Sequence, residues 1–558
     1  MKVVIVGGVA GGASVATRLR RMDERATIVL LERGPYISFA NCGLPYYIGG
    51  VIPDRNSLLV QTPEALKATF DVDARVYHAV TEINRSSRVV TVQNETTGET
   101  YTETYDKLVL SPGAAPFVPP IAGSDLEDVF VLRTIPDTDA IKAFVDSEGP
   151  RRATIVGGGF IGVELAENLH LRGIQVTLVE MLNQILVPLD YEMAAIVHDH
   201  LRENEMQLIL GDGLKAIESQ GDGLAVVLQS ERRVETDMVI LAIGVRPENH
   251  VAKDAGLELG LRGTIATNEY LQTSDPDIYA IGDASQIVHY ITGHPANIAL
   301  AGPASKQGRL VADHIAGKPV RYQGAQGTSI VKVFDLSVAS TGLNERQLGQ
   351  ERIPAQSITI HTANHAGYYP GASPLTLKLI YDPEQGKILG AQVVGKGGVD
   401  KRIDVIATAI RAGLTTFDLE EIELAYAPPF GSARDPVNIA GFVASNILRG
   451  DSKMLYWQDI KELDPDKDLL LDVRNPDEVD RGAIEGAINI PLPQLRSRLD
   501  ELPTDRRIVV YCHVGQRAYY AYRILVQRGF DVINLCGGFK TYSHVIRDQT
   551  DPNIRQEN

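Results

Sequence analysis

The sequence predicts a mixed α/β protein built from several domains. Two stretches, residues 3–32 and 154–180, each repeat the order apolar strand, glycine-rich turn, helix and second strand, which is typical of a parallel βαβ unit. The third observation is length, because 558 residues with 44% hydrophobic content exceed what one core usually supports. We therefore expect three to five domains, with parallel α/β sheets in the first half of the chain.

The composition restricts the classes of partner. A formal net charge of −17 argues against a nucleic acid held by bulk electrostatics. The three cysteines Cys42, Cys512 and Cys536 form neither a disulfide framework nor a zinc-type spacing, so we expect no metal site and a reducing, cytoplasmic setting. No basic leader precedes the first strand and no apolar run is long enough for a bilayer, so we expect no membrane association.

The first βαβ unit has the features of a dinucleotide site. Its turn contains Gly7, Gly8 and Gly12, which let the backbone approach a pyrophosphate at the start of the following helix. Glu32 ends the next strand, twenty residues after Gly12, where a carboxylate can accept ribose hydroxyls. Val9 stands where the usual motif has its middle glycine.

The second βαβ unit matches the dinucleotide motif fully. Gly157, Gly159 and Gly162 give G-x-G-x-x-G, and Glu180 follows eighteen residues later. This carboxylate can bond a ribose 2′-hydroxyl and would repel a 2′-phosphate, and the next residue, Met181, offers no compensating charge. The motif predicts NADH as the nucleotide, with NADPH as the alternative.

The helix after the first turn carries one polar face. Ser14, Arg18, Arg21 and Arg25 recur at helical spacing, so three guanidiniums and a hydroxyl lie along one side. Such a face suits the phosphates of a ligand. The alternative is an ordinary solvated helix surface.

Cys42 is the candidate reactive thiol. It lies just beyond the first βαβ unit in residues 38–47, SFANCGLPYY. At the start of a helix after a tight turn, the helix dipole would favour its thiolate, which is the nucleophile. The alternative is a small buried hydrophobic residue.

The order of the motifs resembles the FAD- and NAD(P)-dependent pyridine nucleotide-disulfide oxidoreductases. Five segments carry the resemblance: residues 7–12, 107–114, 157–162, 241–244 and 281–283. It implies FAD and NADH as cofactors. It also implies that Gly282 and Asp283 contact the flavin, with Asp283 on the ribityl chain, and that Phe160 lies beside the nicotinamide pocket.

The surroundings of Cys42 narrow the subgroup. Glutathione reductase-like members have a second redox cysteine after four intervening residues and a C-terminal His-Glu pair, whereas here Tyr47 stands at that position and residues 426–430 read YAPPF. A disulfide within this stretch is excluded. The stretch is instead similar to coenzyme A-disulfide reductases and their NADH oxidase and peroxidase relatives, which use one active cysteine.

This resemblance implies a coenzyme A site and a homodimer. In the coenzyme A enzymes two tyrosines of the partner subunit approach the cysteine, and here they would be Tyr368 and Tyr426, with Tyr369 as the alternative for the first. The alternative is that these tyrosines have no chemical role and only pack at an interface. The residues implied to hold coenzyme A are Ser14, Arg18, Arg21, Ser38 and Asn41.

The last hundred residues form a separate unit. After the polar segment 449–453, an apolar strand runs into Cys512, and a loop to Arg517 leads into a helix. Inward-pointing amides at such a helix start stabilise a thiolate or a charged sulfur adduct. The loop resembles that of rhodaneses, which implies catalytic roles for Cys512 and Arg517; a C-x5-R phosphatase loop would be one residue longer. Cys536 is interpreted as structural.

Combined, these observations predict two Rossmann-like (FAD and NAD) domains, an α+β dimerisation domain and a C-terminal α/β rhodanese domain. The expected boundaries are FAD-binding 1–113 and 266–320, NAD(P)H-binding 114–265, dimerisation 321–448, linker 449–455 and rhodanese 456–558.

The predicted function is FAD-dependent, NADH-driven reduction of coenzyme A persulfide, polysulfide and coenzyme A disulfide through Cys42, coupled to sulfur transfer at Cys512. Three alternatives remain. They are a coenzyme A-disulfide reductase with an accessory rhodanese domain, an NADH oxidase or peroxidase that uses Cys42 as a sulfenic acid, and a redox sensor without turnover.

Overall fold

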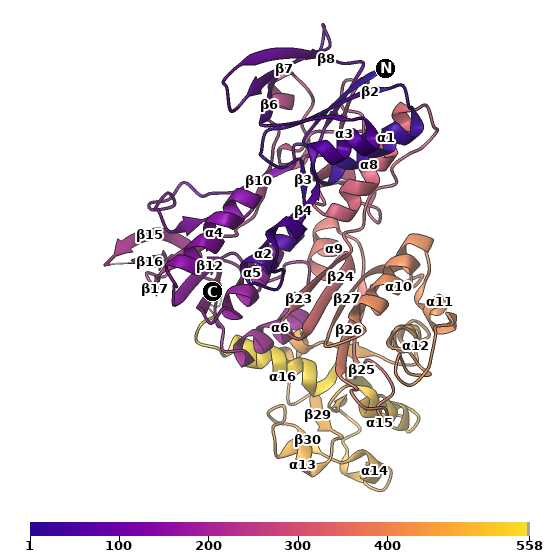
Figure 1. Cartoon of the computed structure of the whole chain (residues 1–558). Helices are drawn as coiled ribbons and strands as arrows, with labels where there is room; N and C mark the ends of the chain where they lie inside the picture. Colours follow the sequence, from indigo (N-terminus) through magenta and orange to yellow (C-terminus); the bar gives the residue numbers. More distant parts are fainter. Residues whose placement is uncertain (222, 555–558) are drawn as a thin grey trace. The chain divides into compact units, whose positions relative to one another are not determined.

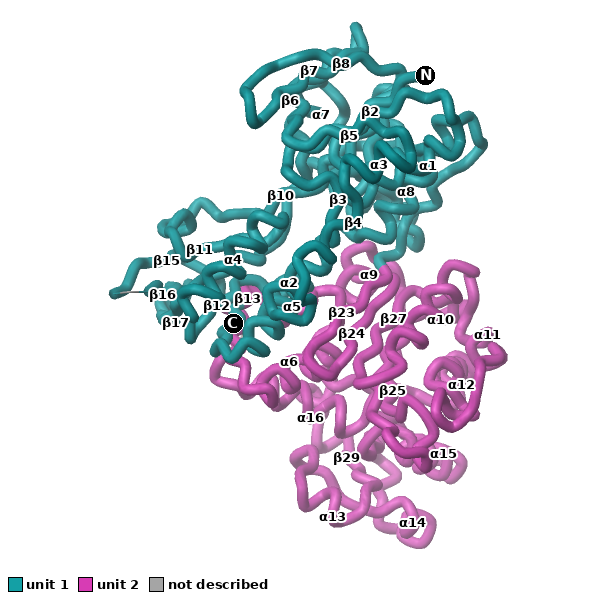
Figure 2. The backbone as a smooth tube through the Cα atoms, viewed as in Figure 1, with its two compact units in different colours: residues 1–179, 213–327 teal, residues 180–212, 328–558 magenta. Residues whose placement is uncertain are grey.

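The structure is a computed structural model that describes residues 1–221 and 223–554. The chain divides into two compact units, one of residues 1–179 and 213–327 and the other of residues 180–212 and residue 328 onward (Figure 2). Each unit is described by itself.

The first unit contains a parallel sheet in the strand order β20-β9-β1-β2-β5. Its central strands are short runs of Val, Ile and Leu that are buried on both faces, as expected for a parallel sheet. One face packs against helices α1 and α8, which lie alongside each other (Figure 1). The elements are β1 (Lys2–Val6), α1 (Ala10–Met22), β2 (Thr27–Glu32), β5 (Asp73–Val76), β9 (Lys107–Leu110), β20 (Ile278–Ala280) and α8 (Ala301–Ile315).

The opposite face of that sheet packs against a three-stranded antiparallel sheet. Alternating burial along its strands keeps one face against the core and the other in solvent. Its strands are β6 (His78–Asn84), β7 (Val89–Asn94) and β8 (Thr100–Thr104).

A second parallel arrangement in the first unit places strands side by side in the order β11, β18, β12, β13. Helix α5 follows β12 directly, which is the βαβ connection that the sequence predicts. The elements are β11 (Val129–Phe130), α4 (Ile135–Ser147), β12 (Arg152–Val156), α5 (Phe160–His170), β13 (Gln175–Glu180), β15 (Leu214–Gln220), β16 (Gly223–Leu228), β17 (Arg233–Thr236) and β18 (Met238–Leu241).

The second unit contains an antiparallel sheet in the order β23-β24-β27-β26-β25. Helices α10 and α12 pack on it. The elements are α6 (Tyr191–Glu203), β14 (Gln207–Leu210), β23 (Ser329–Val333), β24 (Leu336–Gly342), α9 (Glu345–Glu351), β25 (Gln356–Ala363), β26 (Pro374–Tyr381), β27 (Ile388–Gly395), α10 (Val399–Ala412), α11 (Thr416–Glu421) and α12 (Pro436–Leu448).

The C-terminal part of the second unit is a parallel sheet in the order β28-β32-β31-β29-β30 with its own core. Met454 and Leu455, placed in the linker from sequence, form the edge strand β28. The elements are β28 (Met454–Leu455), β29 (Asp468–Asp472), α13 (Pro476–Val479), β30 (Ile488–Asn489), α14 (Leu492–Leu495), β31 (Arg507–Tyr511), α15 (Gln516–Val526), β32 (Val532–Leu535) and α16 (Gly538–Gln549).

This C-terminal sheet domain is joined to the rest of the second unit by buried polar contacts. Helix α16 packs against α6, where Asp548 accepts hydrogen bonds from His198 and Arg202 at 2.9 and 2.8 Å. At β25, the Tyr456 hydroxyl donates to the carbonyl of Ser357 at 2.9 Å. The polar segment at 449–453 therefore precedes a domain that packs firmly against its neighbour.

The mixed α/β class is confirmed. Both glycine turns follow parallel strands, and the C-terminal cysteine loop follows a parallel strand as well. Among the described residues, no helix has the length and apolar character needed to span a bilayer.

Candidate functional site

The first glycine turn is shaped for close backbone approach. Gly7 has φ +90°, and a Cβ there would lie 2.1 Å from the carbonyl oxygen of Ser111. A Cβ on Gly12 would lie 1.9 Å from the Gly7 carbonyl oxygen. Helix α1 starts without a side-chain cap and without an acidic residue in its first turn, so its N-terminus suits a phosphate.

The end of β2 supplies the acidic group next to this turn. Glu32 accepts hydrogen bonds from the backbone amides of Gly8 at 3.0 Å and Gly34 at 2.9 Å. These amides fix the carboxylate and leave it further acceptor capacity for ribose hydroxyls. The turn and the carboxylate thus fit the adenosine diphosphate part of FAD.

The predicted flavin contact Asp283 follows β20 in the same unit. The amide of Gly282 donates to Gln307 at 2.7 Å, and Asp283 forms an ion pair with Arg133 at 3.2 Å. Both side chains of this pair are partly exposed. Sequence reasoning did not find Arg133 or Gln307, because neither belongs to a motif.

The second glycine turn repeats the geometry of the first. Gly157 has φ +113°, and a Cβ on Gly162 would lie 1.9 Å from its carbonyl oxygen. Around Gly159 the space is open, and Phe160 begins α5 without an acidic residue in the first turn. These features fit a nucleotide pyrophosphate. Glu180 ends β13, where its carboxylate accepts the amide of Leu182 at 2.9 Å.

Cys42 lies exposed in a single 3-10 turn, Asn41–Gly43, that leads into the five-residue helix α2 (Leu44–Ile48). Surrounding protein atoms remove part of the water around the thiol, and this raises its pKa; the carboxylates of Glu164 and Asp283 add to the effect. The prediction that a helix dipole favours the thiolate of Cys42 is therefore wrong, because the pKa of this thiol is raised and not lowered. A five-residue helix has a weak dipole, and desolvation of the thiol, with nearby negative charge as a smaller contribution, outweighs it.

A tyrosine and a carboxylate adjoin this cysteine within the first unit. The Tyr46 hydroxyl, one turn after Cys42, donates to Glu164 on α5 at 2.9 Å. Burial raises the pKa of Glu164, and burial together with Glu164 raises the pKa of Tyr46. The G-x-G-x-x-G motif could have pointed to Glu164, since it stands two residues after Gly162.

The predicted coenzyme A residues on α1 have partners already. Ser14 donates to the Ala10 carbonyl at 2.7 Å and lies 3.2 Å from the Ser305 hydroxyl on α8. Arg18 pairs with Asp313 on α8 at 2.8 Å, with both side chains mostly buried. Arg21 is exposed and stacks toward the Phe70 ring at 6.0 Å. On this face Ser14 and Arg18 therefore pack against α8, whereas Arg21 is open to solvent.

The other two predicted coenzyme A residues adjoin Cys42 in sequence. Ser38 is buried in the short strand β3 (Ser38–Phe39), and Asn41 is half-buried at the start of the 3-10 turn. Their role in holding coenzyme A stays a prediction.

The two predicted tyrosines are brought together in the second unit. The hydroxyls of Tyr368 and Tyr426 lie 2.9 Å apart, and the side chains are 77% and 47% exposed. That hydrogen bond raises the pKa of Tyr368. The neighbouring Tyr369 instead packs edge-on against His365 at 5.8 Å. The geometry favours Tyr368 over Tyr369 as the partner of Tyr426.

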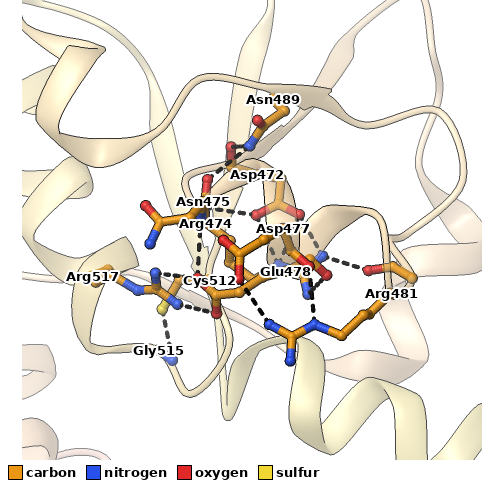
Figure 3. A network of polar contacts seen from close by, with 11 residues as sticks. Asp472, Arg474, Asn475, Asp477, Glu478, Arg481, Asn489, Cys512, Gly515 and Arg517 are labelled. Atoms are coloured by element: carbon orange, nitrogen blue, oxygen red, sulfur yellow. Dashed lines mark hydrogen bonds and ion pairs between the residues drawn. The ribbon is translucent and has the colours of Figure 1, made fainter.

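The C-terminal cysteine lies at the base of a loop between β31 and α15. Cys512 is buried, and the amide of Gly515, a residue with φ +93°, donates to its sulfur at 3.2 Å (Figure 3). The guanidinium of Arg517 lies close enough to the Cys512 side chain for the two groups to interact electrostatically. A backbone amide that donates to the sulfur and a guanidinium beside it are groups that suit a charged sulfur adduct.

A network of charged residues surrounds this loop (Figure 3). Arg517 donates to both carboxylate oxygens of Glu478, at 2.6 Å each. This pair lowers the pKa of Glu478 to about 2. In the same network, Arg474 and Asp472 form an almost fully buried pair at 2.6 Å. Sequence reasoning missed Glu478, which lies four residues after Arg474.

Cys536 is buried in the same domain, at the end of β32. Its sulfur accepts the amide of Thr359 at 3.2 Å, and burial raises its pKa to about 11. Such a thiol is protonated at neutral pH and packs as a hydrophobic residue, as predicted.

Models of known families match most of the chain. The pyridine nucleotide-disulphide oxidoreductase model matches residues 1–308, the dimerisation domain of the same family matches 328–436, and the rhodanese-like domain matches 456–544.

Two relatives align with about four-fifths of the chain. The coenzyme A disulfide reductase of Staphylococcus haemolyticus is 35% identical over 447 residues, which are 80% of this chain and 100% of that protein. The Staphylococcus aureus enzyme of the same name is 37% identical over 444 residues, 79% of this chain and 99% of its own.

Two solved structures cover nearly the whole chain. The reduced CoADR-RHD of Bacillus anthracis is 53% identical with a TM-score of 0.96 and covers 98% of each chain. An NAD-dependent persulfide reductase from A. fulgidus is 37% identical with a TM-score of 0.91, covering 97% of this chain and 100% of its own. The chain therefore belongs to the pyridine nucleotide-disulphide oxidoreductase family, whose members use FAD and NAD(P)H, and carries a C-terminal rhodanese domain.

Proposed function

We propose that this protein is an NADH-dependent reductase of coenzyme A persulfide and polysulfide, which also accepts coenzyme A disulfide, and that its rhodanese domain transfers sulfane sulfur at Cys512. The proposal depends on one exposed cysteine, Cys42, which lies near enough to Glu164 on α5 and to Asp283 for both carboxylates to act on its thiol. The other two cysteines of the chain are buried in the C-terminal domain. A single thiol reacts with a sulfur substrate directly instead of forming its own disulfide.

In this proposal Cys42 provides the nucleophile. Its sulfur attacks the S–S bond of coenzyme A persulfide, a mixed disulfide between Cys42 and coenzyme A forms, and sulfide leaves. FAD and NADH, when bound, supply the two electrons that return the thiols. The balance is one persulfide and one NADH consumed for one coenzyme A thiol, one hydrosulfide ion and one NAD⁺.

The tyrosine pair fits a proton role in this proposal. Hydroxyls that share a hydrogen bond can give a proton to a leaving thiolate. Tyr368 and Tyr426 of a partner subunit would do so in a homodimer, which the matching dimerisation domain supports. Glu180 supports NADH over NADPH, because a carboxylate at the ribose repels a 2′-phosphate.

Steady-state NADH oxidation tests the proposal. Wild-type protein and Cys42→Ser are compared with coenzyme A persulfide, polysulfide, coenzyme A disulfide and hydrogen peroxide. The variant should retain FAD and NADH-driven flavin reduction and lose turnover of the sulfur substrates. Near-normal sulfur turnover by the variant refutes the role of Cys42, and a dominant rate with peroxide or oxygen identifies an oxidase or peroxidase.

A further inference from the structure

The Cys512 loop contains an anion site that the protein itself already fills. Arg517 is the guanidinium next to the sulfur, and both of its terminal nitrogens donate to Glu478 at 2.6 Å. The two side chains are 31% and 21% exposed, so the pair is partly desolvated at the loop. A doubly charged substrate approaching Cys512 would meet a cation whose charge is already compensated.

Two of the other basic groups around the loop, Arg474 and His513, add little free positive charge, whereas Lys540 does act on the loop with its charge. Arg474 is compensated by Asp472 and is 2% exposed. Burial and the positive charge of Lys540 lower the pKa of His513, so its ring is neutral at neutral pH. Lys540 itself donates its backbone amide to the His513 carbonyl at 2.9 Å, and burial lowers the pKa of its amine.

We infer that Glu478 is a positioning residue that sets the donor specificity of Cys512: by occupying Arg517 it directs the loop toward sulfur donors of low negative charge and against dianions such as thiosulfate. This inference rests on the proposed sulfur transfer at Cys512. The preferred donors of Cys512 are then persulfides and related sulfane sulfur compounds with at most one negative charge near the reacting sulfur.

The chemistry is the same for donors of either charge. The Cys512 thiolate attacks the outer sulfur of thiosulfate, the S–S bond breaks, and sulfite leaves with the bonding electron pair. The Cys512 persulfide then gives its outer sulfur to cyanide, which becomes thiocyanate, and the thiolate returns. With methanethiosulfonate the same steps release methanesulfinate, so the two donors differ by one unit of charge.

Glu478→Gln tests the inference with little disturbance of the backbone. Glu478 also accepts the amide of Asn475 at 3.2 Å as the third residue of the α13 capping box. Glutamine can serve the same capping role. The variant therefore removes the charge opposite Arg517 while keeping the cap.

The experiment measures kcat/KM for thiosulfate and for methanethiosulfonate, with cyanide as acceptor, on the full-length protein with its cofactors. Removing one charge at this site should raise the thiosulfate to methanethiosulfonate ratio by about tenfold, mainly through a lower KM for thiosulfate. Glu478→Asp keeps the charge and should keep the wild-type ratio. A merely structural defect would lower both rates together.

Asp477→Asn is the matched control. Asp477 is the adjacent carboxylate, exposed and paired with Arg481 rather than with Arg517. Its loss should leave the ratio unchanged. An unchanged ratio in Glu478→Gln, or an equal rise in Asp477→Asn, overturns the specificity role. Absence of cyanide-dependent transfer from both donors in the wild type refutes the sulfur transfer itself, and with it this inference.

If Glu478→Gln folds poorly, an inhibition measurement on the wild-type protein tests the same charge preference. Sulfite and methanesulfinate are the matched products, and their inhibition constants against methanethiosulfonate report the charge preference of the loop. Weaker inhibition by sulfite dianion supports the inference, and tighter inhibition by sulfite overturns it.

Discussion

The replacement Lys378→Met perturbs a buried charge cluster in the second unit. Lys378 lies on β26 with its side chain 1% exposed, and its ammonium contacts Glu192 at 2.5 Å, Asp190 at 2.9 Å and Glu345 at 3.0 Å. Asp190 and Glu192 belong to the start of α6, and Glu345 begins α9. Methionine matches the volume and flexibility of the lysine stem but carries no charge.

The expected cost is about 3–5 kcal/mol at pH 8, because removing one partner of a buried ion cluster leaves uncompensated charge. Gln392 still donates to Asp190 at 2.7 Å, and Trp457 still contacts Glu192 at 3.4 Å, so part of the cluster remains hydrogen-bonded. Glu345 is 39% exposed and can turn to water. The loss therefore comes mainly from the two buried carboxylates.

The sign of the pH dependence follows from these carboxylates. In the wild type, burial acts to raise the pKa of Glu192, and the Lys378 charge outweighs it, so the pKa is lowered. Without Lys378, burial raises the folded-state pKa values of Glu192 and Asp190 above their unfolded values. Groups with raised pKa values favour the folded state at low pH and lose that stability as the pH rises. The deficit of the variant should be small near pH 5 and large at pH 8.

Urea denaturation followed by the fluorescence of Trp457 measures this deficit, since Trp457 is the one tryptophan of the sequence and contacts the cluster. Lys467→Met is the control, because Lys467 is 80% exposed and its pair with Asp464 is screened by water, so its loss should leave the free energy of unfolding nearly unchanged. A loss below about 1 kcal/mol at pH 8 for Lys378→Met, or a loss that does not change with pH, would refute the reasoning.

Three further predictions concern the reactive sites. Glu164→Gln should lower the pKa of the Cys42 thiol, because the carboxylate raises it; an unchanged midpoint in the pH profile of iodoacetamide alkylation contradicts this. Charge removal at Arg18 and Arg21 should raise the KM for coenzyme A disulfide and spare small polysulfides, whereas equal effects would show a merely solvated face. Cys512→Ser should abolish thiocyanate formation and spare reduction of coenzyme A disulfide. If the variant oxidises NADH more slowly with particular persulfide donors, sulfur passes from Cys512 to Cys42 in a relay. Unchanged rates for every donor would exclude such a relay.

The sequence by itself located the features that lie within a few residues of one another. Gly157 and Gly162 are five positions apart, and the structure shows why only glycine fits at the second position: a Cβ on Gly162 would meet the Gly157 carbonyl. The Cys512 loop is likewise defined by a short run of residues between a strand and a helix. Local patterns of this kind depend on backbone sterics and capping, which a sequence specifies directly.

Only the tertiary structure determines which charged side chains contact the residues of these local motifs. Glu478 lies 39 positions before Arg517, and Asp313 lies 295 positions after Arg18, yet each pair is in contact. The direction of the Cys42 pKa shift was predicted wrongly for the same reason, since desolvation of the thiol and the charge of Glu164 both arise from tertiary packing, including that of α2 against α5. Coulombic interactions depend on distance in space and on local desolvation, and the fold sets both through strand order and helix packing that no short pattern encodes.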